Sequence, residues 1–75
     1  MTDVKKVYQL IGKNIKKYRK LKGYTQQQLA DKINMGLNFT GKIEVAYTYP
    51  SIPTLVLIAD ALGIEVMNLF EPNEK

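Results

Sequence analysis

The residues of this sequence best suited to chemistry lie at positions 37–42, where apolar, amide, small and basic side chains follow one another. If this stretch is helical, its outward positions are Leu37, Asn38, Gly41 and Lys42. An asparagine amide can pair with adenine through two hydrogen bonds, a lysine can donate to guanine or phosphate, and a leucine can contact a thymine methyl group. Such a stretch reads base edges only if it projects from the surface as the second helix of a hairpin, and many helical hairpins look similar.

The charge distribution favours a polyanionic partner. Residues 1–42 carry ten basic groups against two acidic ones, whereas residues 43–75 carry one lysine against five acidic groups. A basic half in so short a chain suggests a polyanion, and a solvated, lysine-rich helix is the alternative on charge alone. The solvated face would hold the lysines at positions 5, 6, 13, 16, 17, 20 and 22, which add to the field that attracts DNA.

The composition argues against several other classes of protein. The chain has 75 residues without cysteine or histidine, and it lacks a glycine-rich phosphate loop and a close acidic pair. We therefore expect that the protein is not an enzyme and that it has no metal site, no cofactor and no small-molecule substrate. The absence of cysteine fits a reducing cytoplasm. The first residues do not resemble a signal peptide, and Pro53, Asp60 and Glu65 interrupt the most apolar window, so we expect a soluble, cytoplasmic protein without membrane contact.

The elements that must position residues 37–42 are predicted to be helices. Apolar residues at spacings of three and four predict a first helix over residues 4–21, ended by Gly23. Thr25 and Gln28 have the spacing of a capping box that starts a second helix. Residues 34–36 (Asn-Met-Gly) predict a tight turn, because Asn and Gly both tolerate left-handed backbone geometry. A third helix is expected over residues 37–45.

Two further helices are predicted after a loop at residues 46–50. Ser51 is a suitable cap and Pro53 suits the first turn of a fourth helix, which ends at Leu62 before Gly63. The run at 55–58 would also fit a strand by propensity, but its spacing with later apolar residues favours helix. A short fifth helix is expected over residues 65–70. The fold class is therefore all-α with five helices, in a single domain of residues 1–75 with its core within 7–70.

Several motifs stand at a fixed mutual spacing. They are TQQQLADK at 25–32, Ile43-Glu44, Pro50-Ser51, the run from Leu55 to Leu62-Gly63-Ile64, and Asn68-Leu69-Phe70. In these motifs the sequence resembles the lambda-repressor-like (XRE-type, Cro/C1) helix-turn-helix family. The resemblance extends over residues 11–70 without gaps. It is also similar to the controller proteins of restriction–modification systems. The resemblance implies a sequence-specific transcriptional regulator or repressor, a homodimer whose recognition helices enter the major groove of a palindromic double-stranded DNA operator.

The resemblance also implies residue roles. Gln26 would hold a phosphate through its side chain or the helix N-terminus, and the outward residues of the third helix would read bases. Arg19 and Glu44 fall where the family has a structural ion pair between the first and third helices. The full set of expected DNA contacts is Thr25, Gln26, Gln27, Leu37, Asn38, Phe39, Gly41, Lys42 and Tyr47.

The sequence departs from the family after Glu44. Val45-Ala46 replaces the usual Arg-Gly, and Tyr47-Thr48-Tyr49 replaces a basic loop, although a tyrosine hydroxyl can donate to phosphate. Gly41 inside a helix costs about 1 kcal/mol relative to alanine. This glycine either carries that cost or allows the DNA backbone to approach closely.

The fourth helix has more apolar positions than one buried stripe needs. An exposed apolar patch on a small domain suggests a partner. We expect a two-fold dimer with recognition helices about 34 Å apart. The alternative is a protein-interaction module, such as an antitoxin or anti-repressor, whose main ligand is another protein. The residues expected in the dimer interface are Leu57, Val66, Met67 and Phe70.

Overall fold

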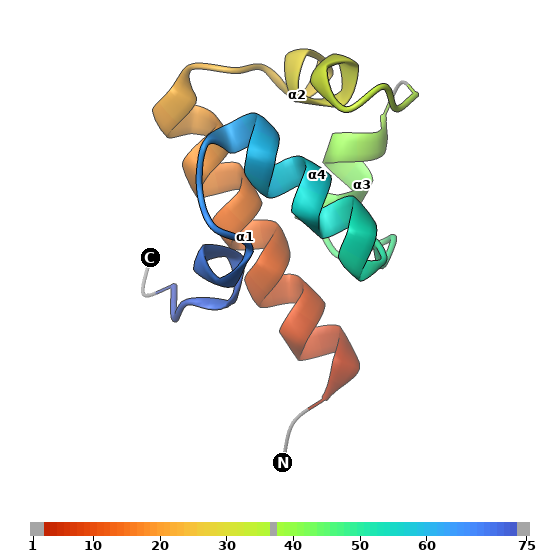
Figure 1. The fold of residues 1–75 in the computed structure, drawn as a ribbon. Coiled ribbons are helices and arrows are strands. Elements are labelled where there is room, and N and C mark those ends of the chain that lie inside the picture. Colours follow the sequence, from red (N-terminus) through yellow and green to blue (C-terminus); the bar gives the residue numbers. More distant parts are fainter. Residues whose placement is uncertain (1–2, 37, 74–75) are drawn as a thin grey trace.

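The computed structural model describes residues 3–36 and 38–73, so the predicted contact residue Leu37 lies outside the described residues. Over these ranges the chain is helical and contains no strand, as predicted (Figure 1). The elements are α1 (Val4–Lys22), α2 (Gln26–Lys32), α3 (Phe39–Glu44), α4 (Ile52–Leu62) and the 3-10 turn η1 (Val66–Phe70). The expected fifth helix is thus a 3-10 turn, which follows from its short length and the proline at position 72.

Helix α1 is the element against which α3, α4 and η1 all pack. It begins after Asp3, whose carboxylate accepts from the Lys5 amide at 2.9 Å, and it ends at Gly23, whose φ of 79° is left-handed. Its buried stripe includes Ile11 and Ile15. Val4 has the phase of this stripe but is exposed, because it lies in the first turn, ahead of the covered part of the helix.

Helices α2 and α3 form a hairpin at one end of the molecule (Figure 1). The capping box is present: the Gln28 amide donates to Thr25 Oγ1 at 3.0 Å, and the Thr25 amide donates to Gln28 Oε1 at 2.8 Å. In the connecting segment Asn34 and Asn38 have left-handed φ values of 59° and 73°. Because Asn38 is left-handed, α3 begins at Phe39 and not at position 37 as expected.

Helix α4 closes the core over α1, α2 and η1. Ser51 Oγ accepts from the Thr54 amide at 3.4 Å, Pro53 lies in the first turn, and Gly63 ends the helix with a φ of 69°. The run at 55–58 is helical. No helix among the described residues is both long and apolar enough to span a bilayer. The buried apolar core consists of Ile11, Ile15, Leu29, Ile33, Ile43, Leu55, Ile58, Ala59, Leu62 and Leu69.

A close backbone contact at Gly12 sets the position of α3 against α1. A Cβ atom at Gly12 would lie 2.6 Å from the carbonyl oxygens of both Ile43 and Glu44, closer than any real contact. These carbonyl groups belong to the last turn of α3, so the absence of a side chain at Gly12 allows the two helices to meet.

We expect Gly12→Ala to lower the free energy of unfolding by about 2–3 kcal/mol, because the added methyl group meets backbone atoms that cannot rotate away. Urea denaturation followed by circular dichroism measures this. Gly36→Ala is the matched control, since a Cβ there meets nothing within 4 Å. It should change stability by less than about 1 kcal/mol. Equal effects of the two substitutions would contradict the close contact.

Candidate nucleic-acid interface

The outward face of α3 carries a single stripe of side chains. Asn38, Lys42 and Val45 are exposed and Gly41 is half-buried, at the spacing of positions that share one side of a helix. Together with Gln26 and Tyr47 they line a shallow hollow of about 310 Å³. The fold therefore brings together five of the predicted contact residues, from α2, α3 and the following loop.

The orientation of α3 depends on a buried ion pair between Arg19 and Glu44. Arg19 Nε lies 2.6 Å from Glu44 Oε2, and Nη2 donates to Oε1 at 3.2 Å. Arg19 Nη1 also donates to the carbonyl of Tyr24 at 2.8 Å. Arg19 is 7% exposed and Glu44 8%. This two-pronged pairing connects α1 to the last residue of α3 and to the segment before α2.

Gln26 extends this pair toward the surface. Its Nε2 donates to Glu44 Oε1 at 3.0 Å, so the side chain lies across α3. A Cβ atom at Gly41 would lie 3.3 Å from Gln26 Oε1. The small residue at Gly41 therefore leaves room for the Gln26 side chain of the same chain.

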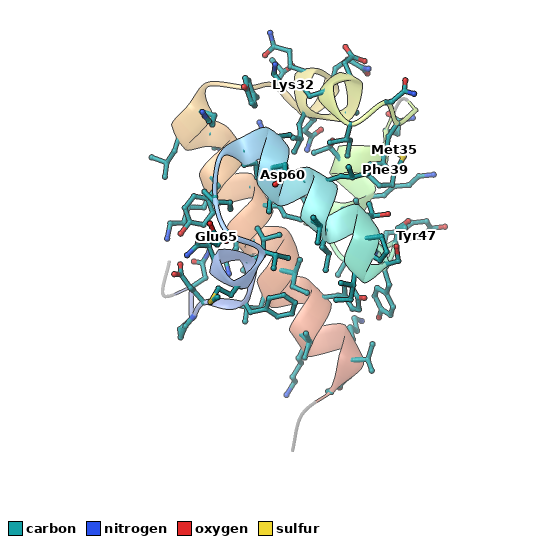
Figure 2. All side chains as sticks on the ribbon, in the orientation of Figure 1. Lys32, Met35, Phe39, Tyr47, Asp60 and Glu65 are labelled. Carbon is teal, nitrogen blue, oxygen red and sulfur yellow. The ribbon has the colours of Figure 1, made fainter. Side chains whose placement is uncertain are left out.

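The other predicted contact residues differ in how many contacts they make within the protein itself. Thr25 is exposed, but its hydroxyl accepts the capping hydrogen bond. Gln27 is exposed and donates to Asp31 Oδ1 at 2.8 Å. Phe39 is half-buried and packs against the core, near Met35 in the hairpin loop (Figure 2). Of these three, Phe39 offers the least surface to a ligand.

The loop after α3 carries two exposed tyrosines, of which one stacks on a residue of α1. Ala46 has a left-handed φ of 60°, and the Tyr47 amide donates to the Lys42 carbonyl at 2.8 Å, so the chain turns sharply. Tyr47 projects away from the ribbon (Figure 2), with Lys42 Nζ 5.9 Å from its ring centre. Tyr49 instead stacks on Tyr8, with ring centres 4.5 Å apart.

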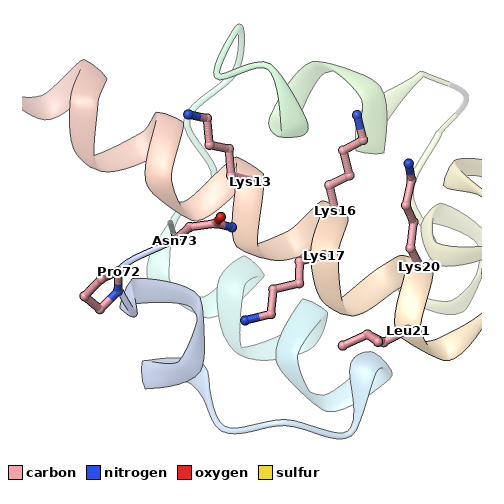
Figure 3. Close-up of a pocket in the computed structure, with 7 residues that line it drawn as sticks. All are labelled: Lys13, Lys16, Lys17, Lys20, Leu21, Pro72 and Asn73. Carbon is pink, nitrogen blue, oxygen red and sulfur yellow. The ribbon is translucent and has the colours of Figure 1, made fainter. Parts of the chain in front are cut away.

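A row of basic groups on α1 borders this face. Lys13, Lys16 and Lys20 extend toward the side of α3, whereas Lys17 extends the other way (Figure 3). Lys13 also shares a small hollow with Glu44 and Val45. The positive charge of α1 therefore lies partly beside the outward face of α3.

The four residues predicted for the dimer interface lie on α4 and η1. Leu57, Met67 and Phe70 are exposed, whereas Val66 is half-buried and packs against the core. Leu57 lines a hollow with Lys32 and Ile33 at the end of α2, whereas Val66, Met67 and Phe70 belong to η1. The exposed apolar residues on α4 and η1 are separate from the residues that line the hollow beside α3.

A polar cluster fastens η1 to α1. Asn14 is fully buried, and its Nδ2 donates to the carbonyls of Leu69 and Glu71 at 2.9 and 2.8 Å. Tyr18 donates to Glu71 Oε1 at 2.8 Å. This hydrogen bond, with a second from Asn68 and the charge of Lys17, lowers the pKa of Glu71. The same hydrogen bond raises the pKa of Tyr18. Asn14 carried no motif that would have marked it in the sequence.

The fold and its outward-facing second helix define a helix-turn-helix domain. The helix-turn-helix family model HTH_3 matches residues 15–67. The chain belongs to this family, of the XRE (Cro/C1) type, whose members are DNA-binding transcriptional regulators. The family resemblance and the all-helical fold predicted from the sequence are confirmed.

Three known proteins show the extent of the similarity. The immunity repressor protein of Bacillus phage phi105 is 43% identical over 56 residues, which are 75% of this chain and 39% of that repressor, so the chain spans about two fifths of its length. The restriction–modification controller protein C.AhdI from Aeromonas hydrophila superposes with a TM-score of 0.80 at 27% identity, over 84% of this chain and 96% of that one. SinR, a master regulator for biofilm formation solved in complex with DNA, gives a TM-score of 0.74 at 37% identity, over 81% of this chain and 98% of that one.

We expect Glu44→Gln to lower the free energy of unfolding by about 3 kcal/mol, because it leaves the Arg19 guanidinium buried without a counter-charge. Chemical denaturation measures the change. The double variant Arg19→Met with Glu44→Leu removes both charges and should lose less stability than Glu44→Gln. If the single variant were as stable as the unmodified chain, the ion pair would not hold α3 in place.

Proposed function

We propose that this protein is a sequence-specific regulator of transcription that places α3 in the major groove of double-stranded DNA and acts as a homodimer on a palindromic operator. The observation that supports this most directly is the exposed stripe of α3, which shares one hollow with Gln26 and Tyr47. An α-helix fits the major groove, where each base pair shows a distinct set of donors and acceptors. The relation to SinR, solved with DNA, is consistent with this use of the fold.

Each side chain of the stripe matches a different part of the duplex. Asn38 supplies an amide for adenine, and Lys42 supplies an ammonium group for guanine or a nearby phosphate. Tyr47 presents a hydroxyl donor at the edge of the face, suited to a phosphate oxygen. We also assign Thr25, Gln27, Leu37 and Phe39 to the border of the interface. Gln26 helps to orient α3 through its hydrogen bond to Glu44. Its remaining polar atoms would contact the phosphate backbone of the DNA.

The charge of α1 complements this contact. Lys13, Lys16 and Lys20 extend toward the side of α3 and raise the positive potential there (Figure 3). Binding should therefore weaken steeply as salt rises, because each phosphate contact releases counterions. If the host is bacterial, like those of the relatives above, the operator and this protein would meet in the cytoplasm.

The homodimer would form through the apolar surface of α4 and η1. Leu57, Met67 and Phe70 are exposed on these elements, and none of them lines the hollow beside α3, so pairing there would leave the α3 stripe uncovered. A two-fold axis through this surface would direct both α3 helices toward one side, about 34 Å apart, which is one turn of DNA. The tight hydrogen bonding of Asn14 to the end of η1 keeps the surface in a fixed shape.

We expect selection from random DNA to return a symmetric consensus for the unmodified protein. Asn38→Gly should then weaken binding to that site about tenfold, the loss expected for one paired base edge. Glycine is the suitable replacement because Asn38 has a φ of 73°, which alanine adopts at a cost. Lys42→Ala should weaken binding and reduce the salt dependence by about one phosphate contact.

Lys6→Ala is the matched control for charge, since Lys6 is exposed in the first turn of α1 and outside the hollow. It should leave the selected consensus unchanged. Thermal melts of all variants check the fold. If no DNA is retained selectively, the apolar surface becomes the main binding surface, and the protein is an interaction module such as an antitoxin or anti-repressor.

We expect Leu57→Glu to raise the dissociation constant of the dimer at least about tenfold, because a carboxylate would be buried opposite its own copy. Sedimentation equilibrium measures this. Leu21→Glu, an equally drastic change at an exposed leucine of α1, should leave association unchanged. A monomer at high micromolar concentration in the unmodified protein would reject the dimer.

A further inference from the structure

Val45 is an exposed apolar residue in the middle of an otherwise polar surface. It follows the last residue of α3 and is 73% exposed, although β-branched apolar residues are usually buried. In the sequence, Val45 stands out only because it replaces the arginine that is usual in the family. The structure places it in the hollow with Gln26, Lys42 and Tyr47.

The helical phase explains why Val45 belongs to the outward stripe. It lies three residues after Lys42 and four after Gly41, the spacing of one side of a helix, and all three line one hollow with Asn38. Val45 therefore lengthens that stripe by one turn. Helix α3 itself ends at Glu44, so the signal that identifies Val45 is its phase with the stripe combined with its exposure.

The backbone around Val45 is held firmly. The Val45 amide donates to the Gly41 carbonyl at 3.3 Å, and the next two amides, of Ala46 and Tyr47, donate to Ile43 and Lys42 at 3.0 and 2.8 Å. A valine side chain also has few rotamers. A contact made by Val45 would therefore cost little conformational entropy.

The major groove offers one prominent apolar group, the C5 methyl of thymine. Resting on the proposed function, we propose that Val45 is a specificity-determining residue that contacts the C5 methyl group of one thymine in each half-site. Lys42 and Asn38 contact polar groups of the bases. Val45 contacts an apolar group, the thymine methyl, one helical turn further along the groove. Its contact excludes water from two apolar surfaces that both face solvent before binding.

The test replaces each thymine of the selected site by uracil, which removes only the methyl group. For the unmodified protein, one uracil position per half-site should weaken binding about fourfold, the effect of exposing one buried methyl-sized group. In Val45→Ala the same uracil should weaken binding less than about twofold, while thermal stability stays unchanged because the side chain is exposed. The measurement is equilibrium binding at one salt concentration.

Leu21→Ala is the matched control, because Leu21 is also 73% exposed but lies at the end of α1, outside the hollow. It should retain the full uracil effect. The inference is overturned if no thymine methyl couples to Val45, including the case in which Val45→Ala weakens binding equally to thymine and uracil sites, as a contact with deoxyribose would. Failure of the unmodified protein to select any sequence would instead reject the proposed function itself.

Discussion

The buried pairing of Arg19 with Glu44 is the interaction on which the outward face depends. A six-residue helix such as α3 is too short to be stable in isolation, so its direction is set by tertiary contacts. Glu44 at its last turn receives hydrogen bonds from Arg19 on α1 and from Gln26 at the start of α2. The Glu44 carboxylate therefore fixes α2 and α3 relative to each other and to α1. A shift of α3 would break both contacts and leave charge buried.

Two glycines lie where other parts of the chain approach closely. At Gly12 the backbone of α1 meets carbonyl groups of α3, and at Gly41 the side chain of Gln26 crosses α3. With both contacts in place, α3 is fixed on its inner side by α1 and on its flank by α2. The exposed side chains of Lys42 and Val45 take no part in these contacts, so they are available to contact groups outside the protein.

The sequence predicted best those features that depend on neighbours along the chain. The capping box of Thr25 and Gln28, the helix ends at Gly23 and Gly63, and the cap at Ser51 are local chemistry. Features set by distant partners were missed: Gly12 opposite the end of α3, and Asn14 bonded to residues 55 and 57 positions later. The start of α3 was misplaced because left-handed geometry was expected only within residues 34–36, whereas Asn38 adopts it as well as Asn34.

Helix α4 connects the two surfaces mechanically. Its inner residues Leu55, Ile58 and Leu62 are almost fully buried against the same core that holds α1, while Leu57 faces outward. In the proposed dimer, α4 would carry the two-fold contact on one side and the core on the other. The distance between the two α3 helices would then be set by packed side chains and by the Arg19–Glu44 pair, and it would not depend on the conformation of a loop. A domain with a total stability of only about 4–11 kcal/mol gains rigidity from such an arrangement, because burying Leu57 and its neighbours stabilises the same core that orients α3.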